Sequence, residues 1–427
     1  MSLKLKDFIT KLRACKTSEE EKQLILKEKA AIRQSFQKNQ HQLKPRNLIK
    51  LLFINLQGYD TEFGQIESLN VTCRNSFVEK KVGYLTMQIF LHEKSEMLMM
   101  TTNRINLDLD HPNLYIKGQA LSTFSSISDQ DMAQQIHPKI KQLIDYQQRR
   151  QFSITNKKSG YQEDKHVIDN MKKKAILSAF RVICKQPQLY EEYLPLLPKV
   201  FDQSSHGLWI SALPLFDRLY ELGVQNPTHR QALNNLLPLF VKKIRKLVSH
   251  LDPDYSFHSV NDPFLIIGLL RSINGVLKKS QACGLGVDES INQDVVKLVF
   301  FIIGRFKPHK KAVNAVLYEL ARLTLFYKHN ESLTSCGFHI LNQLMETKES
   351  SPNFKFASLN LLKSFENISE SSLKLLSNHC TLLLEIICKE DEDDSLRILA
   401  LQVLSKITSH ENLTNVVETL KQLLLKN

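Results

Sequence analysis

Apolar residues recur with a helical period along almost the whole chain. The clearest stretch is residues 17–36, where apolar positions follow the i, i+3, i+4, i+7 spacing of an amphipathic helix. Its apolar face consists of Leu24, Ile25, Ala31, Ile32 and Phe36. Thr17 precedes this face, and Glu20 follows Thr17 by three residues, which is the capping-box arrangement of a helix N-terminus. The pattern therefore predicts a helix that begins just after Thr17.

A second pattern recurs in several of these helical stretches: a small residue, an apolar residue, any residue, and two apolar positions. It occurs six times, and the small residues that begin the six copies are Thr86, Ala179, Ala212, Gly337, Ser358 and Ala400. A small residue lets a neighbouring helix approach closely, and recurrence at spacings near one helix or one helix pair is typical of helical repeats. The 13 Gly and 13 Pro among 427 residues are about half of the average usage, which disfavours turn-rich β architecture. We therefore expect an all-α fold, an α-solenoid of degenerate HEAT- or armadillo-like repeats.

Two segments interrupt the helical pattern. Residues 147–168 are polar and basic and contain Ser159-Gly160, so we expect a flexible basic loop there. Residues 389–394 read Lys-Glu-Asp-Glu-Asp-Asp, which is typical of a solvated acidic turn. No linker rich in Pro, Gly or Ser divides the chain, so the expected organisation is one solenoid over residues 1–427.

The net charge of +13 and the pI near 9.2 point to a polyanionic partner, either nucleic acid or an anionic membrane surface. Nucleic-acid modules usually place aromatic residues among their basic ones, because aromatic rings stack on bases. The main basic clusters, 44–50 and 172–174, contain no aromatic residue. This favours membrane phosphate over nucleic acid. A basic HEAT-repeat protein that binds nucleic acid or serves nuclear transport is the alternative.

Motifs of catalysis are absent from the sequence. Neither a phosphate-binding loop, a dinucleotide fingerprint, a nucleophile elbow nor a zinc-protease motif occurs. The seven cysteines are scattered without a Cys-x-x-Cys pair, which predicts no disulfide framework and no metal site and fits a reducing cytosol. The longest apolar run, residues 298–303, is far shorter than the ~18 residues of a membrane span. We expect a protein that is not an enzyme and needs no cofactor.

Many collinear segments, most densely in the first 145 residues or so, resemble the N-terminal trunk of the large adaptin subunits of heterotetrameric clathrin adaptors, most of all gamma-adaptin. Runs that carry the resemblance include Arg13-Ala-Cys-Lys-Thr17, Arg46-Asn-Leu-Ile-Lys-Leu-Leu-Phe53, Glu79-Lys-Lys-Val-Gly-Tyr-Leu85 and Gly118-Gln-Ala-Leu121. Asn261-Asp-Pro-Phe-Leu265 favours the gamma type over the alpha type, whereas Leu52-Phe-Ile-Asn-Leu56 suits alpha about as well.

The resemblance implies a fold, partners and a location. The family fold is an α-solenoid that curls around a small (sigma) subunit and packs beside a beta-adaptin and a medium (mu) subunit. The family acts in vesicle-mediated protein transport, where it links transmembrane cargo to clathrin. We expect this subunit to associate with clathrin only indirectly. The implied place is the cytoplasmic surface of trans-Golgi, endosomal and coated-vesicle membranes. The hinge and ear domains of full subunits are not found in this sequence.

The resemblance also implies a membrane site. Lys44, Arg46 and Lys50 match basic positions of the family's phosphoinositide site, which agrees with the basic balance of the chain. We expect the three cations to face one patch. The alternative for each is a solvated cation near a helix end.

Two contacts with other proteins follow from the same resemblance. Arg13 matches the trunk arginine that helps the sigma subunit hold the acidic residue of a dileucine cargo signal, and its alternative is a solvated helix arginine. Leu69 and Met100 fall where the family contacts an activated Arf-type GTPase. For both of these apolar residues the alternative is a place in the core.

Overall fold

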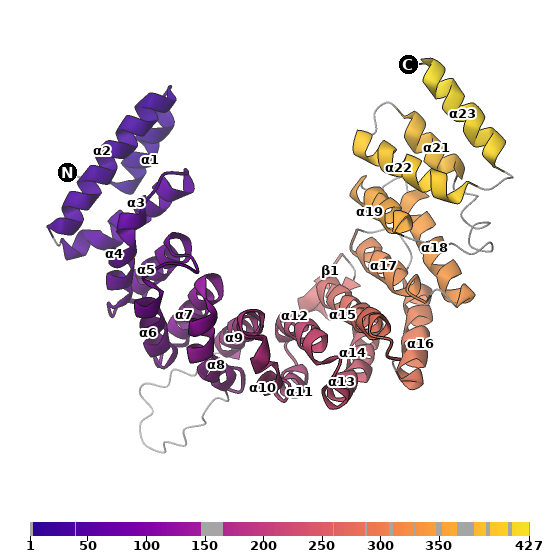
Figure 1. Ribbon diagram of the computed structural model, residues 1–427, viewed down its shortest axis with the longest axis horizontal. Helices are drawn as coiled ribbons and strands as arrows, with labels where there is room; N and C mark the ends of the chain where they lie inside the picture. The colour runs from indigo at the N-terminus through magenta and orange to yellow at the C-terminus, as the bar shows by residue number, and fades with distance from the viewer. Residues whose placement is uncertain are drawn as a thin grey trace. The chain divides into compact units, whose positions relative to one another are not determined.

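The structure, a computed structural model, describes residues 3–38, 40–146, 165–258, 260–286, 288–306, 311–327, 330–346, 352–364, 380–389, 393–408 and 412–426. The chain divides into two compact units, Met1–Leu222 and Gly223–Asn427, which are described separately. Figure 1 shows both as stacks of helices.

The described part of the first unit is built mainly of helices. They are α1 (Leu5–Ala14), α2 (Ser18–Gln37), α3 (Lys44–Leu56), α4 (Gln65–Thr72), α5 (Phe77–Phe90), α6 (Leu98–Leu109), α7 (Leu114–Ile127), α8 (Gln130–Ile144), α9 (Lys165–Lys185), α10 (Tyr190–Tyr193), α11 (Leu196–Phe201) and α12 (His206–Gly223). Short 3-10 turns, His41–Leu43, Glu62–Gly64 and Pro187–Leu189, precede α3, α4 and α10.

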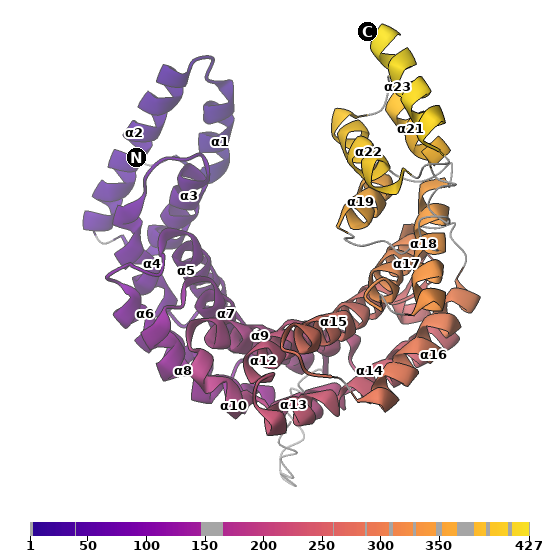
Figure 2. The ribbon, with the colours of Figure 1, turned by 45° about the vertical axis from the view of Figure 1, so that its right-hand side comes forward.

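Helices of this unit form two layers. In one layer α3, α5, α7 and α9 pack in sequence, and in the other α4 packs on α6 and α6 on α8. Contacts within the pairs α4–α5, α6–α7 and α8–α9 hold the two layers together (Figure 2). Close approach within a pair depends on small residues: a Cβ added at Gly83 of α5 would lie 2.8 Å from the backbone oxygen of Ser68 on α4.

The second unit also consists mainly of packed helices, with one small hairpin. Its elements are α13 (Pro227–Asn234), α14 (Leu237–Ser249), a 3-10 turn (Pro253–Tyr255), β1 (Ser256–Phe257), β2 (Val260–Asn261), α15 (Pro263–Ala282), α16 (Glu289–Arg305), α17 (Lys311–Thr324), α18 (Glu331–Glu346), α19 (Pro352–Lys363), α21 (Cys380–Cys388), α22 (Asp394–Ile407) and α23 (Leu413–Lys426). The strands pair antiparallel. α15 packs on α17, α17 on α18 and α19, and α19 on α22.

The sequence patterns have structural counterparts. Thr17 caps α2 by accepting a hydrogen bond from the backbone N–H of Glu20 at 3.3 Å. All six small residues of the recurring pattern are buried, which agrees with their expected place between packed helices. The expectation of an all-α solenoid is confirmed. Residues 147–164 of the expected basic loop lie outside the described part of the chain, whereas residues 165–168 belong to α9 and not to a loop.

Candidate functional site

The three cations expected at the membrane all lie on α3, but they do not share one exposed surface. Lys50 is fully buried: its Nζ lies 2.6 Å from Glu28 Oε1 on α2 and donates to the backbone oxygen of Leu3 at 3.0 Å. Glu28 is 4% exposed and also accepts from the backbone N–H of Leu3 at 3.2 Å. This buried ion pair therefore ties the N-terminal segment and α2 to α3.

Burial lowers the pKa of Lys50, while the hydrogen bond and charge of Glu28 raise it and the nearby charge of Arg46 lowers it again. Arg46 and Lys50 are four residues apart on one helix side, and Lys44 points elsewhere. Lys44 is 4% exposed, with its Nζ 2.8 Å from Glu67 Oε2. The expectation that the three cations face one patch is wrong, because Lys44 and Lys50 are buried against different acidic partners. Phosphoinositide binding itself stays a prediction.

Lys44 nevertheless lines a surface hollow of about 410 Å³, together with His41, Asn70, Cys73 and Arg74. We call it the α3–α4 hollow. Arg74 Nη2 donates to the backbone oxygen of His41 at 2.5 Å, and its Nη1 lies 2.6 Å from Glu79 Oε1. Two cations and an imidazole thus surround one concave space. Sequence reasoning missed Arg74, because only the packing of α3 on α4 brings it to Lys44.

Arg13 lies in the last turn of α1 and is exposed. A cation there is favourable, because the C-terminal end of a helix carries partial negative charge. The structure gives Arg13 no hydrogen bond or ion pair to another described residue. Its guanidinium therefore faces solvent, as both the cargo role and the solvated alternative require.

Leu69 and Met100 lie on α4 and α6, which are neighbours in one layer. Met100 is 60% exposed, so the alternative of a core position is wrong for this residue. Leu69 is half-buried. Ile66 and Met99 on the same two helices are 60% and 79% exposed. Exposed apolar side chains on adjacent helices are candidates for a protein-binding surface.

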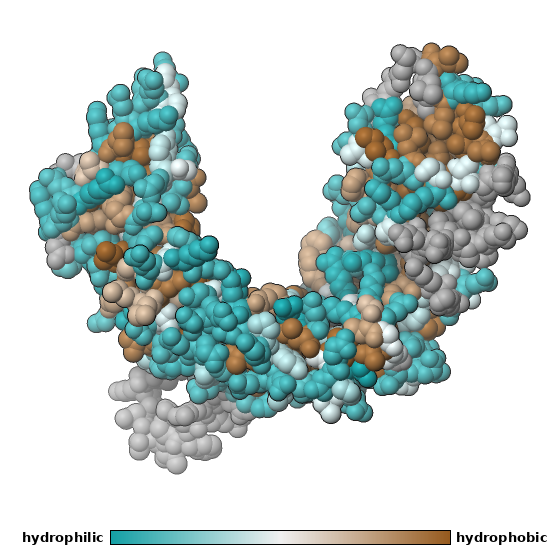
Figure 3. All heavy atoms as spheres, in the orientation of Figure 1, coloured by the Kyte–Doolittle hydropathy of each residue, from teal (hydrophilic) through white to brown (hydrophobic). Residues whose placement is uncertain are grey.

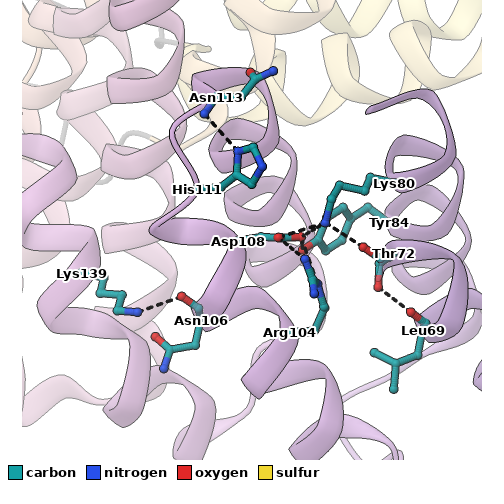
Figure 4. A network of polar contacts seen from close by, with 10 residues as sticks. All are labelled: Leu69, Thr72, Lys80, Tyr84, Arg104, Asn106, Asp108, His111, Asn113 and Lys139. Atoms are coloured by element: carbon teal, nitrogen blue, oxygen red, sulfur yellow. Dashed lines mark hydrogen bonds and ion pairs between the residues drawn. The ribbon is translucent and has the colours of Figure 1, made fainter. Parts of the chain in front are cut away.

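Figure 4 shows a buried polar network that links α4, α5 and α6. Lys80 Nζ lies 3.0 Å from both carboxylate oxygens of Asp108 and donates to the backbone oxygen of Thr72 at 2.8 Å. Tyr84 donates to Asp108 Oδ2 at 2.5 Å, and Arg104 forms an ion pair with the same carboxylate. Burial, helped by the charge of Asp108, raises the pKa of Tyr84 far above its ordinary value, so the phenol stays a neutral donor. The network ties α4, α5 and α6 together.

Apolar side chains also reach the surface elsewhere. On the face drawn in Figure 3 they gather over α21 and α22. Of the α22 residues, Ile398 and Leu401 are 56% and 40% exposed. Within the described residues no three His, Cys, Asp or Glu side chains are grouped so that they could hold a metal ion. None of the helices that the structure describes combines the length and apolar character that a membrane crossing requires.

Stacked helical pairs with a basic hollow and exposed apolar side chains define the class: a helical-repeat trunk of the α-solenoid type. The chain belongs to the adaptin family, because residues 21–427 match the family described as the adaptin N terminal region.

Curated relatives are gamma subunits of one adaptor complex. The AP-1 complex subunit gamma-1 of Arabidopsis thaliana is 29% identical over 98% of this chain and 44% of its own length. The AP-1 complex subunit gamma of Dictyostelium discoideum is 29% identical over 100% of this chain and 43% of its own. The chain thus spans less than half the length of these relatives. The expected likeness to gamma-adaptin is confirmed.

A solved structure supports the fold alone. It is the homology model of the full-length AP-3 complex in an intermediate open conformation, with a TM-score of 0.58 at 19% identity. The match covers 89% of this chain and 57% of that one.

Proposed function

We propose that this chain is the trunk of a large subunit of a clathrin adaptor complex and is not an enzyme. The observation that carries the proposal is the family match over residues 21–427, with gamma subunits of AP-1 as relatives. The trunk would assemble with a beta-adaptin, a medium subunit and a small subunit, and would act at the cytoplasmic face of trans-Golgi and endosomal membranes. Exposed apolar residues on α4, α6 and α22 support a chain that buries surface against partners.

Co-expression tests the assembly. The chain alone should aggregate or bind chaperones, because its apolar surface lacks partners, and co-expression with sigma-type and beta-type subunits should yield a stoichiometric complex on size exclusion. A soluble monomer that ignores both subunits would contradict the proposal. Salt-dependent binding of duplex or single-stranded nucleic acid by that monomer would favour the nucleic-acid alternative.

The membrane contact would use the α3–α4 hollow and, on another side of α3, Arg46. Lys44 and Arg74 would meet a phosphoinositide headgroup and Arg46 the anionic surface around it, while Lys50 would hold the fold. A cation near an anionic leaflet contributes about 1 kcal/mol, which corresponds to about fivefold in affinity. Arg46→Gln and Arg74→Gln should each weaken binding to phosphoinositide-bearing vesicles by about that factor. Lys27→Gln, an exposed cation on α2, is the matched control. Equal binding by all three variants would place the membrane site elsewhere.

An activated Arf-type GTPase would dock on α4 and α6. Met100→Asp should abolish capture of the GTP-loaded GTPase, because a carboxylate would be buried in an apolar contact. Leu69→Ala should weaken capture without abolishing it. Leu26→Asp, at a residue of α2 that is 63% exposed, controls for charge. Capture that survives Met100→Asp would remove this surface from the contact.

Arg13 would bind the acidic residue of a dileucine cargo signal. Arginine pairs bidentately with a carboxylate, which lysine cannot do. In the assembled complex, Arg13→Glu should weaken an acidic dileucine peptide by roughly tenfold, about 1.4 kcal/mol. Binding of a tyrosine-based signal should not change. Equal loss for both peptides would mean that the substitution had damaged the complex, and no loss for either would exclude Arg13.

A further inference from the structure

In the second unit, a small pocket of about 190 Å³ opens between α15, α17 and α19. We call it the α15–α17 pocket. Its polar lining includes Lys278 and Gln281 from α15 and Arg322 from α17. Leu325 and Leu361 contribute apolar wall. The polar groups at this pocket are thus mainly hydrogen-bond donors.

Among the residues that the structure describes, positive charge around the pocket exceeds the negative charge that reaches it. Glu319, which is 2% exposed, is the acidic group beside it. Its Oε1 lies 2.7 Å from Nη2 of Arg271, and Arg271 Nε also donates to it. Arg322 Nη1 lies 3.5 Å from the other oxygen, which accepts no hydrogen bond from the described residues. The Glu319 carboxylate therefore forms a close ion pair with Arg271 and only a longer one with Arg322.

Lys278 is the third cation of this group. Partial burial lowers its pKa, the charge of Arg322 lowers it further, and Glu319 raises it. Lys278 makes no hydrogen bond or ion pair with any other described residue. Like charges held together at a partly dry surface favour an anion between them. The pocket is therefore suited to a carboxylate or phosphate.

A neighbouring hollow decides the kind of ligand. It measures about 320 Å³, and it shares Gln281 and Phe326 with the α15–α17 pocket. Leu277, Leu285 and Tyr327 are among its walls. Its size lies at the lower limit of ligand pockets, about 300 Å³, which leaves room for an apolar side chain. A free phosphate would leave this hollow unused.

We propose that the α15–α17 pocket and its neighbouring hollow bind a short acidic segment of another polypeptide. A carboxylate of the segment pairs with Lys278 and Arg322, and an adjacent apolar side chain enters the hollow beside Phe326. This site lies on the second unit, apart from the residues assigned to membrane, GTPase and cargo. It stands whether or not the chain acts as an adaptor, because it rests on charge and shape alone.

Fluorescence anisotropy of the full chain tests the site with a labelled peptide of sequence Gly-Leu-Glu-Leu-Gly. We expect weak, salt-sensitive binding that falls at least tenfold when Glu in the peptide is replaced by Gln. Lys278→Gln and Arg322→Gln should each weaken the Glu peptide about three- to tenfold and leave the Gln peptide unchanged. Both side chains are partly exposed, so the fold should persist, and circular dichroism checks this. Lys242→Gln, an exposed cation on α14, is the matched control.

Three outcomes would overturn the proposal. The first is equal affinity for the Glu and Gln peptides, and the second is unchanged binding in both Lys278→Gln and Arg322→Gln. The third is evidence that Lys278 and Arg322 bind an anion other than a peptide carboxylate. Complete displacement of the peptide by equimolar inorganic phosphate would show that the site binds a small anion. Vesicles of phosphatidylserine that lose binding in both variants would show a lipid site.

Discussion

The buried pair of Lys50 and Glu28 allows a sharp test of whether this lysine holds the fold or meets the membrane. Lys50→Met keeps the apolar stem but removes the ammonium group. Glu28 then keeps its backbone donor, the N–H of Leu3, but loses the cation 2.6 Å away. Removing one member of a buried ion pair costs about 3–5 kcal/mol, since the remaining charge is left uncompensated. α1, α2 and α3 should therefore open more readily.

Hydrogen exchange followed by mass spectrometry measures this opening in the full chain. Each 1.4 kcal/mol is tenfold in an equilibrium constant, so amides of α1–α3 should exchange more than about a hundredfold faster in Lys50→Met. Exchange in α14–α17 should not change, because these helices belong to the other unit. Lys27→Met, on the exposed side of α2, is the control and should behave like the parent chain.

A double variant separates the pair from the site. Replacing a buried ion pair by apolar residues is often neutral, so Lys50→Met with Glu28→Leu should recover most of the protection. Binding to phosphoinositide vesicles should recover with it, although the cation is still missing. Parent-like exchange in Lys50→Met would refute the structural role. A double variant whose amides are fully protected from exchange but which does not bind phosphoinositide vesicles would assign Lys50 to the membrane site.

Three further predictions concern packing, protonation and the buried network. Gly337→Ala should destabilise the second unit by about 1–3 kcal/mol in denaturant unfolding, because the new Cβ would overlap a side chain of α17, whereas Gly304→Ala, where space is open, should be neutral or stabilising. Burial lowers the pKa of His137, so at acidic pH the unfolded chain binds more protons than the folded chain. The contribution of His137 to stability should therefore be present above pH about 6.5 and fall as the pH drops below it. Thermal unfolding of His137→Gln should lose this pH dependence. Tyr84→Phe should cost about 1.5–3 kcal/mol by hydrogen exchange of α5 and α6, because Asp108 loses a short hydrogen bond to a charged acceptor; parent-like protection would show that the bond contributes nothing.

Much of the fold could be predicted because local rules decide it. Apolar periodicity places helices wherever one face must be buried, and the capping box of Thr17 marks a helix start that the structure reproduces. Small residues such as Ala179 and Ala212 are buried because a packed pair leaves no room for larger ones. Polarity and Ser159-Gly160 predict a loop that reaches residue 168, yet residues 165–168 begin α9, where the apolar side chain of Ile168 is buried.

The site could be predicted less well, because a charge pattern says nothing of what lies opposite. Arg46 and Lys50 look alike in sequence, and only the packing of α2 against α3 shows that Lys50 meets Glu28. Met100 lies in an apolar run that suggests a core position, but it is 60% exposed. The place of Arg74 in the hollow could not be predicted for the same reason, because Arg74 is close to Lys44 in space but not in the sequence.

One run of sequence therefore carries two kinds of function. From Lys44 to Phe53, the chain supplies one cation, Lys44, to a surface hollow and another, Lys50, to a buried pair that ties the N-terminal segment to α3. A substitution of all its basic residues would abolish membrane binding under either reading, because unfolding of α1–α3 would remove the hollow as well. Arg46 and Arg74 separate the two, since neither is buried and partly exposed charge pairs contribute little, so exchange in α1–α3 should stay close to that of the parent chain. Vesicle binding that falls in these variants while exchange stays constant would assign the hollow to the headgroup and leave Lys50 to the fold.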